Sequence, residues 1–300
     1  MLPERTYAGL PTEQVNPKSR ALDRLSTRSL LLLMNREDTG VPRAIHRVLP
    51  DVERAVELIV ASLRGGGRWW MVGAGTSGRF AVLEAAECPP TFNTPPTLIQ
   101  AIMAGGPSAV FRSKEGAEDD QAAAWRAVQR SVKAGDVVLG IAASGVTPFV
   151  EAALGAARSQ GASTILLTGN SAAGTGRTVQ VVIAPSVGPE IIAGSTRLKS
   201  GTATKLILNM LTVATMTRLG KVHGNLMVDV RPTSTKLRAR ALRLIQTITG
   251  VAEAEATRCL QTSGNHTKIA IVMAARHLDA RAARTLLATH HDILRNALTS

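Results

Sequence analysis

The stretch RWWMVGAGTSGR, from Arg68 to Arg79, decides the expected fold together with a similar stretch further along the chain, DVVLGIAASGVTP from Asp136 to Pro148. Each begins with an apolar run, continues through glycine, alanine, serine and threonine, and leads into a helical pattern. This order predicts a strand, a tight turn and a helix. The two loops that join strand to helix therefore share one design.

Three further apolar runs have the same character, and they occupy residues 98–103, 163–168 and 179–184. Runs that are apolar on both faces are typical of strands covered by helices on each side, in a parallel sheet with right-handed crossovers. The sequence therefore predicts an α/β fold, a three-layer α/β/α sandwich with a five-stranded parallel sheet.

Helical patterns flank this predicted sheet. Residues 52–63 place apolar side chains at helical spacing before three glycines, and residues 202–219 carry a second apolar stripe. From Lys236 onward only helical patterns occur, in four segments. We therefore expect four parts: a flexible N-terminal arm at 1–18, an N-terminal helical segment at 19–50, the sheet domain at 51–225 and a C-terminal helical region at 226–300.

Composition excludes several classes of protein. Of the 300 residues 45% are hydrophobic, enough to fill a core, which excludes intrinsic disorder. The 35 Lys and Arg residues against 22 Asp and Glu give a formal charge of +13. Only four Phe, three Trp and one Tyr are present, too few for stacking on bases to be a main activity, so we expect no nucleic-acid partner.

The sequence also lacks the marks of a membrane, secreted or metal-binding protein. It has no apolar run of the roughly 18 residues that a membrane span needs, and its start lacks the apolar stretch of a secretory signal. We therefore expect a cytoplasmic protein with no membrane partner. Cys88, Cys259 and six scattered histidines lack the spacing of a disulfide framework or a metal site, so no metal is expected.

Hydroxyl side chains concentrate in the two loops. Ligands of open α/β sheets bind beyond the carboxyl ends of the strands, where both loops should open. Hydroxyls, backbone N–H groups and the positive end of a helix together favour a phosphate, so the predicted ligand is a phosphorylated small molecule. The same hydroxyls could instead only cap their helices. The candidate binding residues are Thr76, Ser77 and Gly78 in the first loop and Ser144, Gly145 and Thr147 in the second.

A dinucleotide site is an alternative, because Gly73, Gly75 and Gly78 match the pattern GxGxxG after a strand. That fingerprint also needs a carboxylate about 20 residues further on, to bind the ribose. Residues 98–106 contain no acid, which disfavours a nicotinamide cofactor. The absence of GxxxxGK[ST] excludes a P-loop.

Two groups of carboxylates invite an acid–base interpretation. Glu87 lies near the end of the helix that follows the first loop, and we expect Pro89 and Pro90 to stop that helix. The string EGAEDD, residues 115–120, follows the second strand at the start of a helix, where the helix dipole alone favours acids. The pattern alone leaves a solvated or capping role open for each of them.

Several longer strings of the sequence resemble those of a known protein family. The chain resembles the N-acetylmuramic acid 6-phosphate etherases, within the sugar isomerase (SIS) fold family, over nearly its whole length from about Thr12. The strings that carry the resemblance are DRLST (23–27), VGAGTSGR (72–79), ECPPTF (87–92), EGAEDD (115–120), GIAASG (140–145), VGPE (187–190), GSTRLKSGTATK (194–205) and GNLMVDVRPT (224–233).

The resemblance implies a cofactor-free lyase of peptidoglycan recycling. Such an enzyme splits the D-lactyl ether of N-acetylmuramic acid 6-phosphate with water, giving N-acetylglucosamine 6-phosphate and D-lactate. The two essential carboxylates of the family fall on Glu87 and Glu118. By this analogy Glu87 donates a proton to the leaving lactyl oxygen and activates the water, and Glu118 is its partner at C2. The two roles could be exchanged.

The resemblance also bears on charge and assembly. It implies a homodimer, because the family places residues of a neighbouring subunit close to each pocket. The substrate that the resemblance implies is an anionic sugar phosphate, so cationic side chains should face it. Arg197 and Lys199 are the candidates, with Arg79 a further one.

The chain departs from the family pattern in the loops. Val146 stands where Arg is usual, Glu84 replaces a customary Asp, and Asn93 replaces a Gly. Residues 169–174 differ from the usual Cys-Asn-Pro loop.

A non-catalytic sugar-phosphate sensor on the same fold is the alternative function, and an assay for released D-lactate separates the two.

Overall fold

The computed structural model describes residues 9–173 and 179–300, and these divide into two compact units. The first unit contains the chain up to Ala86 together with Pro96–Thr212. The second contains Glu87–Pro95 and Val213–Ser300. The domain boundaries expected from the sequence, at residues 18, 50 and 225, stay predictions.

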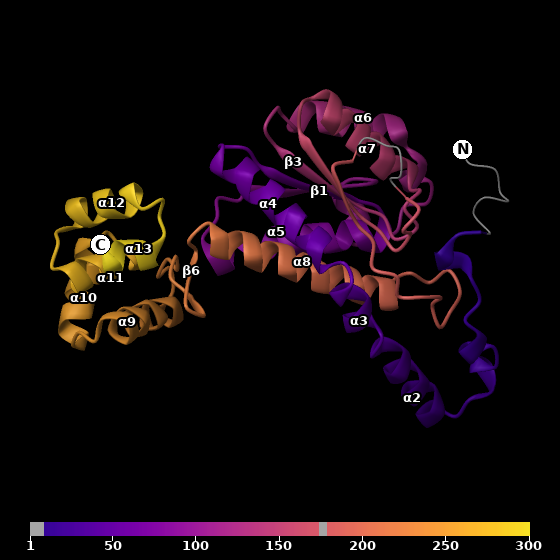
Figure 1. Ribbon diagram of the computed structural model, residues 1–300, viewed down its shortest axis with the longest axis horizontal. Helices are drawn as coiled ribbons and strands as arrows, with labels where there is room; N and C mark the ends of the chain where they lie inside the picture. Colours follow the sequence, from indigo (N-terminus) through magenta and orange to yellow (C-terminus); the bar gives the residue numbers. More distant parts are fainter. Residues whose placement is uncertain (1–8, 174–178) are drawn as a thin grey trace. The chain divides into compact units, whose positions relative to one another are not determined.

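The first unit is built on a five-stranded parallel sheet, which confirms the predicted fold class (Figure 1). The strand order is β2-β1-β3-β4-β5, and Gly73 at the end of β1 is paired with Met103 of β2 on one side and Ile141 of β3 on the other. The strands are β1 (Trp69–Gly73), β2 (Ile99–Met103), β3 (Val137–Ile141), β4 (Ser163–Leu167) and β5 (Val181–Ile183).

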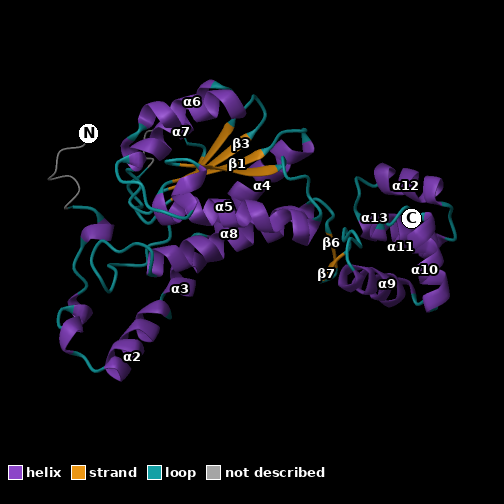
Figure 2. Ribbon diagram, turned by 180° about the vertical axis from the view of Figure 1, so that it is seen from behind, coloured by secondary structure: helices purple, strands orange, loops and turns teal. Residues whose placement is uncertain are grey.

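Helices cover both faces of this sheet because its strands are apolar on both faces. Helices α6 (Gln121–Ser131) and α7 (Pro148–Ser159) cover one face, and α4 (Leu49–Arg64), α5 (Gly75–Phe92) and α8 (Lys199–Arg218) cover the other (Figures 1 and 2). On the first face, Trp70, Val72 and Val138 form one buried cluster with residues of α6 and α7. The sheet is thus the middle layer of three, as expected.

Helices α5 and α8 are joined by a buried polar contact. Glu84 of α5 is only 4% exposed, and its carboxylate forms an ion pair with the ammonium of Lys205 and accepts a hydrogen bond of 2.6 Å from the Thr212 hydroxyl. The side chain that replaces the customary Asp is therefore satisfied between the two helices.

The segment before the sheet is more ordered than the sequence suggests. It contains the helices α2 (Thr27–Asp38) and α3 (Val41–His46) and the short turns η1 (Pro11–Glu13), η2 (Pro17–Ser19) and η3 (Leu22–Arg24). Thr12 is buried, and its carbonyl accepts a hydrogen bond from the Gly194 backbone N–H at 3.1 Å. Thr12 is therefore hydrogen-bonded to a distant loop, while the flexible arm expected at 1–18 stays a prediction. Residues 1–8 of that arm lie outside the described residues.

Helix α5 continues through Pro89 and Pro90, so the expectation that these prolines stop it was wrong. Both lie in its last turn, and their fixed φ is compatible with a helix. The helix ends instead at Asn93, whose φ of 52° is left-handed and whose N–H donates to the Pro89 carbonyl at 2.9 Å. Asn is the residue after Gly that most readily takes this position, so the exchange of Gly for Asn keeps the helix end.

The second unit is a helical cluster around its own core, which includes Val228, Ile245, Leu260 and Ile271. The sequence predicts four helical segments in this region, but the structure has five. The chain breaks once more at His291 and Asp292, which both have left-handed φ. None of the helices in the described residues has the length and hydropathy needed to cross a bilayer. The elements of the second unit are β6 (Val222–His223), β7 (Leu226–Met227), α9 (Thr235–Thr249), α10 (Glu253–Thr262), α11 (Thr267–Arg276), α12 (Ala280–Thr289) and α13 (Leu294–Thr299).

Two glycines set the distance between β1 and α5. A Cβ atom on Gly78 would lie 2.6 Å from the Gly73 carbonyl oxygen, and one on Gly73 would lie 2.7 Å from the Gly78 nitrogen. Both positions are therefore closed to any side chain. The first turn of α5 packs directly against the end of the central strand.

We expect Gly78→Ala to lower the free energy of unfolding by about 1–3 kcal/mol, because the added methyl must push the helix away from the strand. The matched control is Gly155→Ala in α7, where an added Cβ meets nothing within 4 Å. That control should gain about 0.5–1 kcal/mol from helix propensity. Thermal unfolding followed by circular dichroism measures both, and equal behaviour of the two variants would contradict the close contact.

Candidate active site

A cavity of about 310 Å³ opens at the carboxyl ends of β1 and β3, where the strand order reverses. This is the position where open α/β sheets bind ligands. We call it the hydroxyl cavity, because seven of its lining residues carry hydroxyl groups. Thr12 donates its hydroxyl to the neighbouring Glu13 carboxylate. The other six are Thr76, Ser77, Ser144, Thr147, Thr196 and Thr204.

Both predicted loops contribute to the hydroxyl cavity. Thr76 and Ser77 lie in the first turn of α5, and Thr147 is the residue immediately before α7. Thr147 makes no side-chain cap hydrogen bond to α7, so its hydroxyl is not used in the way that the capping alternative requires. The positive ends of two helices and several hydroxyl donors therefore surround one space, which favours an anion.

The two predicted glycines shape this cavity without lining it. Gly78 allows the close approach of α5 to β1 described above. Gly145 has a φ of 75°, and a Cβ there would lie 2.4 Å from the Ala173 side chain and 2.8 Å from the Thr168 hydroxyl. Any side chain at Gly145 would displace the loop that carries Ser144.

Of the two predicted carboxylates, Glu118 lines the hydroxyl cavity, together with Ser77 and Ser144. It is exposed and lies in the short turn η5 (Ala117–Asp119), after β2. Glu87 is an exposed residue of α5 that belongs to the second compact unit, whereas the hydroxyl cavity lies within the first.

The three predicted cations do not line the hydroxyl cavity. Arg197 is exposed, and Arg79 donates to the carbonyls of Ala109 and Val110. Lys199 is only 3% exposed, and its ammonium forms an ion pair with Glu37 at 2.9 Å. Among the described residues, no Lys or Arg side chain lines this cavity, so hydroxyls and backbone groups are its available anion donors.

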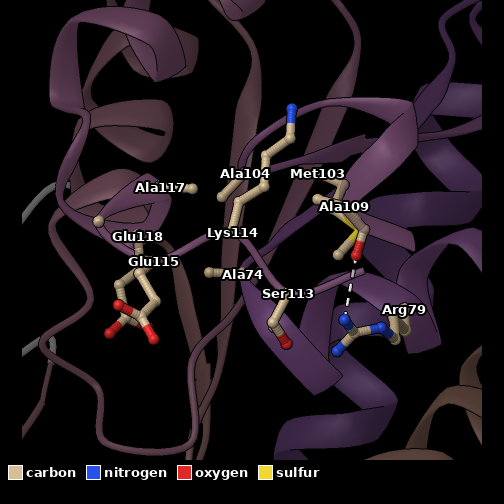
Figure 3. Close-up of a pocket in the computed structure, with 12 residues that line it drawn as sticks. Ala74, Arg79, Met103, Ala104, Ala109, Ser113, Lys114, Glu115, Ala117 and Glu118 are labelled. Carbon is tan, nitrogen blue, oxygen red and sulfur yellow. Dashed lines mark hydrogen bonds between the residues drawn. The ribbon is translucent and has the colours of Figure 1, made fainter. Parts of the chain in front are cut away.

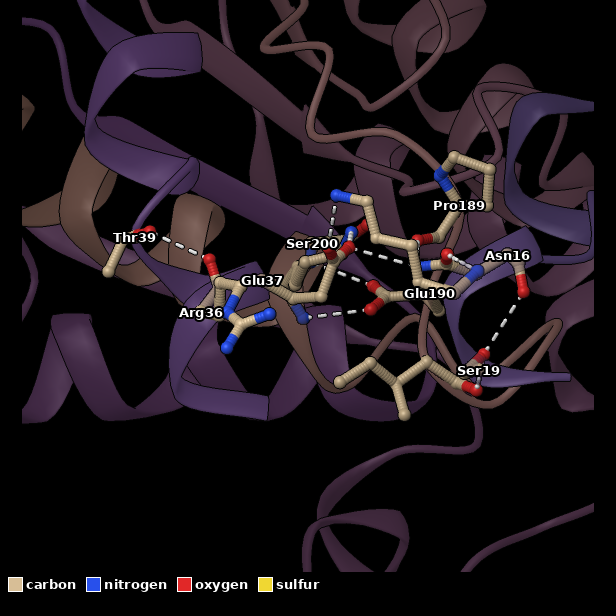
Figure 4. Close-up of polar contacts among 11 residues, drawn as sticks. Asn16, Ser19, Arg36, Glu37, Thr39, Pro189, Glu190 and Ser200 are labelled. Carbon is tan, nitrogen blue, oxygen red and sulfur yellow. Dashed lines mark hydrogen bonds and ion pairs between the residues drawn. The ribbon is translucent and has the colours of Figure 1, made fainter. Parts of the chain in front are cut away.

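Lys199 belongs to a buried carboxylate network near the start of α8 (Figure 4). Glu190, only 1% exposed, accepts hydrogen bonds from the backbone N–H groups of Lys199 and Ser200 at 3.0 and 2.9 Å. Glu37 accepts from Lys18, Lys199 and Asn16. Burial of Glu37 raises its pKa, but these hydrogen bonds outweigh that effect and lower the pKa to about 2. The network fixes the segment that brings Thr196 and Thr204 to the cavity.

Sequence reasoning missed four lining residues with polar side chains: Thr12, Glu13, Thr196 and Thr204. Thr196 and Thr204 lie in GSTRLKSGTATK, one of the strings that carry the family resemblance. The basic residues of that string were predicted instead, because the implied substrate is anionic. Thr12 and Glu13 carry no sequence signal, because only the fold brings them near Gly194. No cluster of three or more His, Cys, Asp or Glu side chains that could hold a metal ion occurs in the part of the chain that the structure describes.

Comparison with known proteins agrees with this geometry. Residues 51–158 match the model of the glucokinase regulatory protein N-terminal SIS domain. The phosphoheptose isomerase GmhA from Neisseria gonorrhoeae shares the fold, with a TM-score of 0.50 and 19% identity over 64% of this chain and 100% of that one. The first unit therefore has a SIS fold.

Full-length relatives place the chain more closely. It is 48% identical to an N-acetylmuramic acid 6-phosphate etherase from Gloeobacter violaceus, over 99% of this chain and 97% of that protein. It is also 48% identical to one from Yersinia pestis, over 98% of this chain and 100% of that protein. The chain belongs to the N-acetylmuramic acid 6-phosphate etherase family.

We expect the stability of the protein to depend on Glu37 at acid pH. A carboxylate with a pKa near 2 in the folded state and about 4.5 in the unfolded state stabilises the fold above pH 4.5, and this contribution is lost as the pH falls towards 2. Glu37→Gln should therefore flatten the fall in stability over that range. Glu57→Gln, at an exposed position of α4, is the control. Denaturant unfolding at several pH values measures the effect, and parallel profiles for wild type and Glu37→Gln would disprove it.

Proposed function

We propose that this protein is a carbon–oxygen lyase that cleaves the D-lactyl ether of N-acetylmuramic acid 6-phosphate with water, giving N-acetylglucosamine 6-phosphate and D-lactate. Its relatives carry the name of that etherase at 48% identity over nearly the full length. The observation that carries the proposal within the molecule is the hydroxyl cavity, where hydroxyls of two helix starts converge beside Glu118.

The hydroxyl cavity binds the phosphate in this proposal. Ser77, Ser144, Thr147 and Thr76 donate hydrogen bonds to its oxygens, with the helix starts adding a positive potential. Hydrogen bonds to a charged group contribute about 1.5–3 kcal/mol each. The phosphate anchors one end of the sugar and leaves its other carbons to extend past Glu118.

The reaction follows from the position of the ether. In the open-chain sugar the C2 proton is next to the C1 aldehyde, so a carboxylate can remove it. The C3–O bond then breaks as an acid protonates the ether oxygen, and D-lactate leaves with the electron pair of that bond. Water adds to C3 of the unsaturated aldehyde while C2 regains a proton, and the same two groups exchange roles.

We assign the step at C2 to Glu118 and the protonation of the lactyl oxygen to Glu87. Glu118 stands at the hydroxyl cavity, where the anchored sugar passes. Glu87 is exposed on α5, the helix whose first turn carries Thr76 and Ser77. The chemistry needs only acid and base groups. We therefore include no cofactor in the proposal.

We further propose that the protein is a cytoplasmic homodimer that acts in peptidoglycan recycling. Support for the dimer comes from large apolar side chains on exposed helix surfaces: Leu31 and Leu32 of α2 are 57% and 55% exposed, and Val213 of α8 is 53% exposed. A second copy could cover such side chains.

Arg197, which is exposed, is the cation we retain as a candidate for the lactyl carboxylate.

The glucokinase regulatory protein gives its name to the matching SIS model, so a sugar-phosphate sensor is the second candidate function. A sensor would bind the phosphosugar in the hydroxyl cavity and release no lactate. The presence of both Glu87 and Glu118 favours the enzyme.

The catalytic assignment predicts the behaviour of two variants. Glu118→Gln and Glu87→Gln should each lower kcat by about 10²–10⁴-fold, because each removes one proton transfer. Asp119→Asn, the exposed neighbour of Glu118, is the matched control and should keep wild-type turnover. Enzymatic detection of D-lactate measures all three.

In heavy water the product should carry deuterium at C2, and lactate release without deuterium would exclude elimination.

The phosphate assignment predicts a separate effect. Ser77→Ala and Ser144→Ala should each raise KM about tenfold or more, because each removes a hydrogen bond to a charged group, while kcat changes less. Ser159→Ala at the far end of α7, whose hydroxyl bonds to the Ala156 carbonyl, serves as the control. If both loop variants keep the wild-type KM, the phosphate lies elsewhere.

A further inference from the structure

A second cavity, of about 220 Å³, adjoins the hydroxyl cavity in the first unit. The two cavities share Ala74, Gly75 and Glu118, so Glu118 stands on their common wall. The second cavity extends from that wall towards the end of β2 and the loop that follows it (Figure 3). It therefore lies directly beside the carboxylate assigned to C2.

This second cavity, which we call the alanine cavity, has small apolar walls. Ala104 and Ala109 are each 3% exposed, Ala117 is partly buried, and Met103 at the end of β2 adds a thioether. Moving a methyl group from water to such a surface is favourable, because apolar area is removed from water. Larger side chains at the alanine positions would fill the space.

The two basic side chains that line the alanine cavity are engaged with the loop itself. Arg79 donates to the Ala109 and Val110 carbonyls at 3.0 and 2.8 Å, and the Lys114 ammonium donates to the Gly105 carbonyl at 2.8 Å. These contacts hold the loop open as a cavity wall. Ser113 lines the same cavity and offers a hydroxyl that can donate to a carbonyl oxygen.

We propose that the alanine cavity receives the 2-acetamido group of the substrate, and that Ala117 and Ser113 make the enzyme specific for N-acylated sugars. The proposal rests on the proposed function, which anchors the phosphate in the hydroxyl cavity and places C2 at Glu118. The acetamido group is attached to that same carbon, so it must occupy space next to Glu118. Its methyl contacts the alanine walls, and its carbonyl accepts from Ser113.

Charge distinguishes this group from the lactyl arm on C3. Glu115 and Glu118 both line the alanine cavity, and their carboxylates are directed to the same side of it (Figure 3). The lactyl arm ends in a carboxylate, which two neighbouring carboxylates repel. The acetamido group is neutral, and its N–H can donate to a carboxylate oxygen.

The test compares two ligands and three variants by calorimetry. The ligands are N-acetylglucosamine 6-phosphate and glucose 6-phosphate, which is neutral at C2 and so forms no ion pair with Glu118. Ala117→Leu fills the cavity. Ala123→Leu is the matched control, because Ala123 is also a partly buried alanine packed against the same core but does not line the cavity. Ser113→Ala removes only the exposed hydroxyl.

We expect the wild type and Ala123→Leu to bind the N-acetylated sugar at least about tenfold more tightly than glucose 6-phosphate, and Ala117→Leu to lose this preference while it still binds glucose 6-phosphate. Ser113→Ala should also reduce this preference, and because Ser113 is exposed we expect the substitution to leave the fold unchanged. Equal loss of both ligands in Ala117→Leu, with an unchanged preference in Ser113→Ala, would overturn the proposal.

Turnover separates this proposal from the proposed function. If the wild type releases no D-lactate but prefers the N-acetylated ligand, the lyase assignment fails and the acetamido site stands. If D-lactate is released and no variant alters the preference, the lyase assignment stands and the acetamido site fails. If Ala117→Leu raises KM for the ether substrate but leaves N-acetylglucosamine 6-phosphate binding unchanged, the cavity holds the lactyl arm and the proposal is wrong.

Discussion

The close approach of Gly73 and Gly78 is the constraint on which the candidate site depends. Backbone atoms of β1 and α5 occupy the space that two Cβ atoms would need. The start of α5 therefore lies against the end of the central strand, and Thr76 and Ser77 face the cavity at the point where the strand order reverses. A longer spacing would carry these hydroxyls and the positive end of the helix away from the second loop.

The carboxylates of the first unit divide into two groups by their surroundings. Glu84, Glu190 and Asp136 are each at most 4% exposed, and their oxygens accept hydrogen bonds from lysine, hydroxyl or backbone donors. Carboxylates held in this way join helices and strands to one another. Glu118, which we propose as the group that acts at C2, is instead exposed on a cavity wall.

Local sequence was sufficient for the sheet and for much of the cavity. The five strands and the two hydroxyl loops were predictable because apolar runs and small polar turns are local features. Lys199 shows the limit, because its burial depends on Glu37, a residue 162 positions away. Thr12 reaches the cavity through a similar long-range contact with Gly194. The end of α5 was mispredicted because Asn93, not the prolines, supplies the left-handed residue that terminates it.

The absence of lysine and arginine from the described lining of the hydroxyl cavity has a consequence for kinetics in solution. The formal charge of +13 attracts an anion over long distances, and dissolved ions screen that attraction beyond about 10 Å at 0.1 M. Short hydrogen bonds inside a cavity are screened far less. Ionic strength should thus govern how often an anion arrives, while its residence time stays nearly constant.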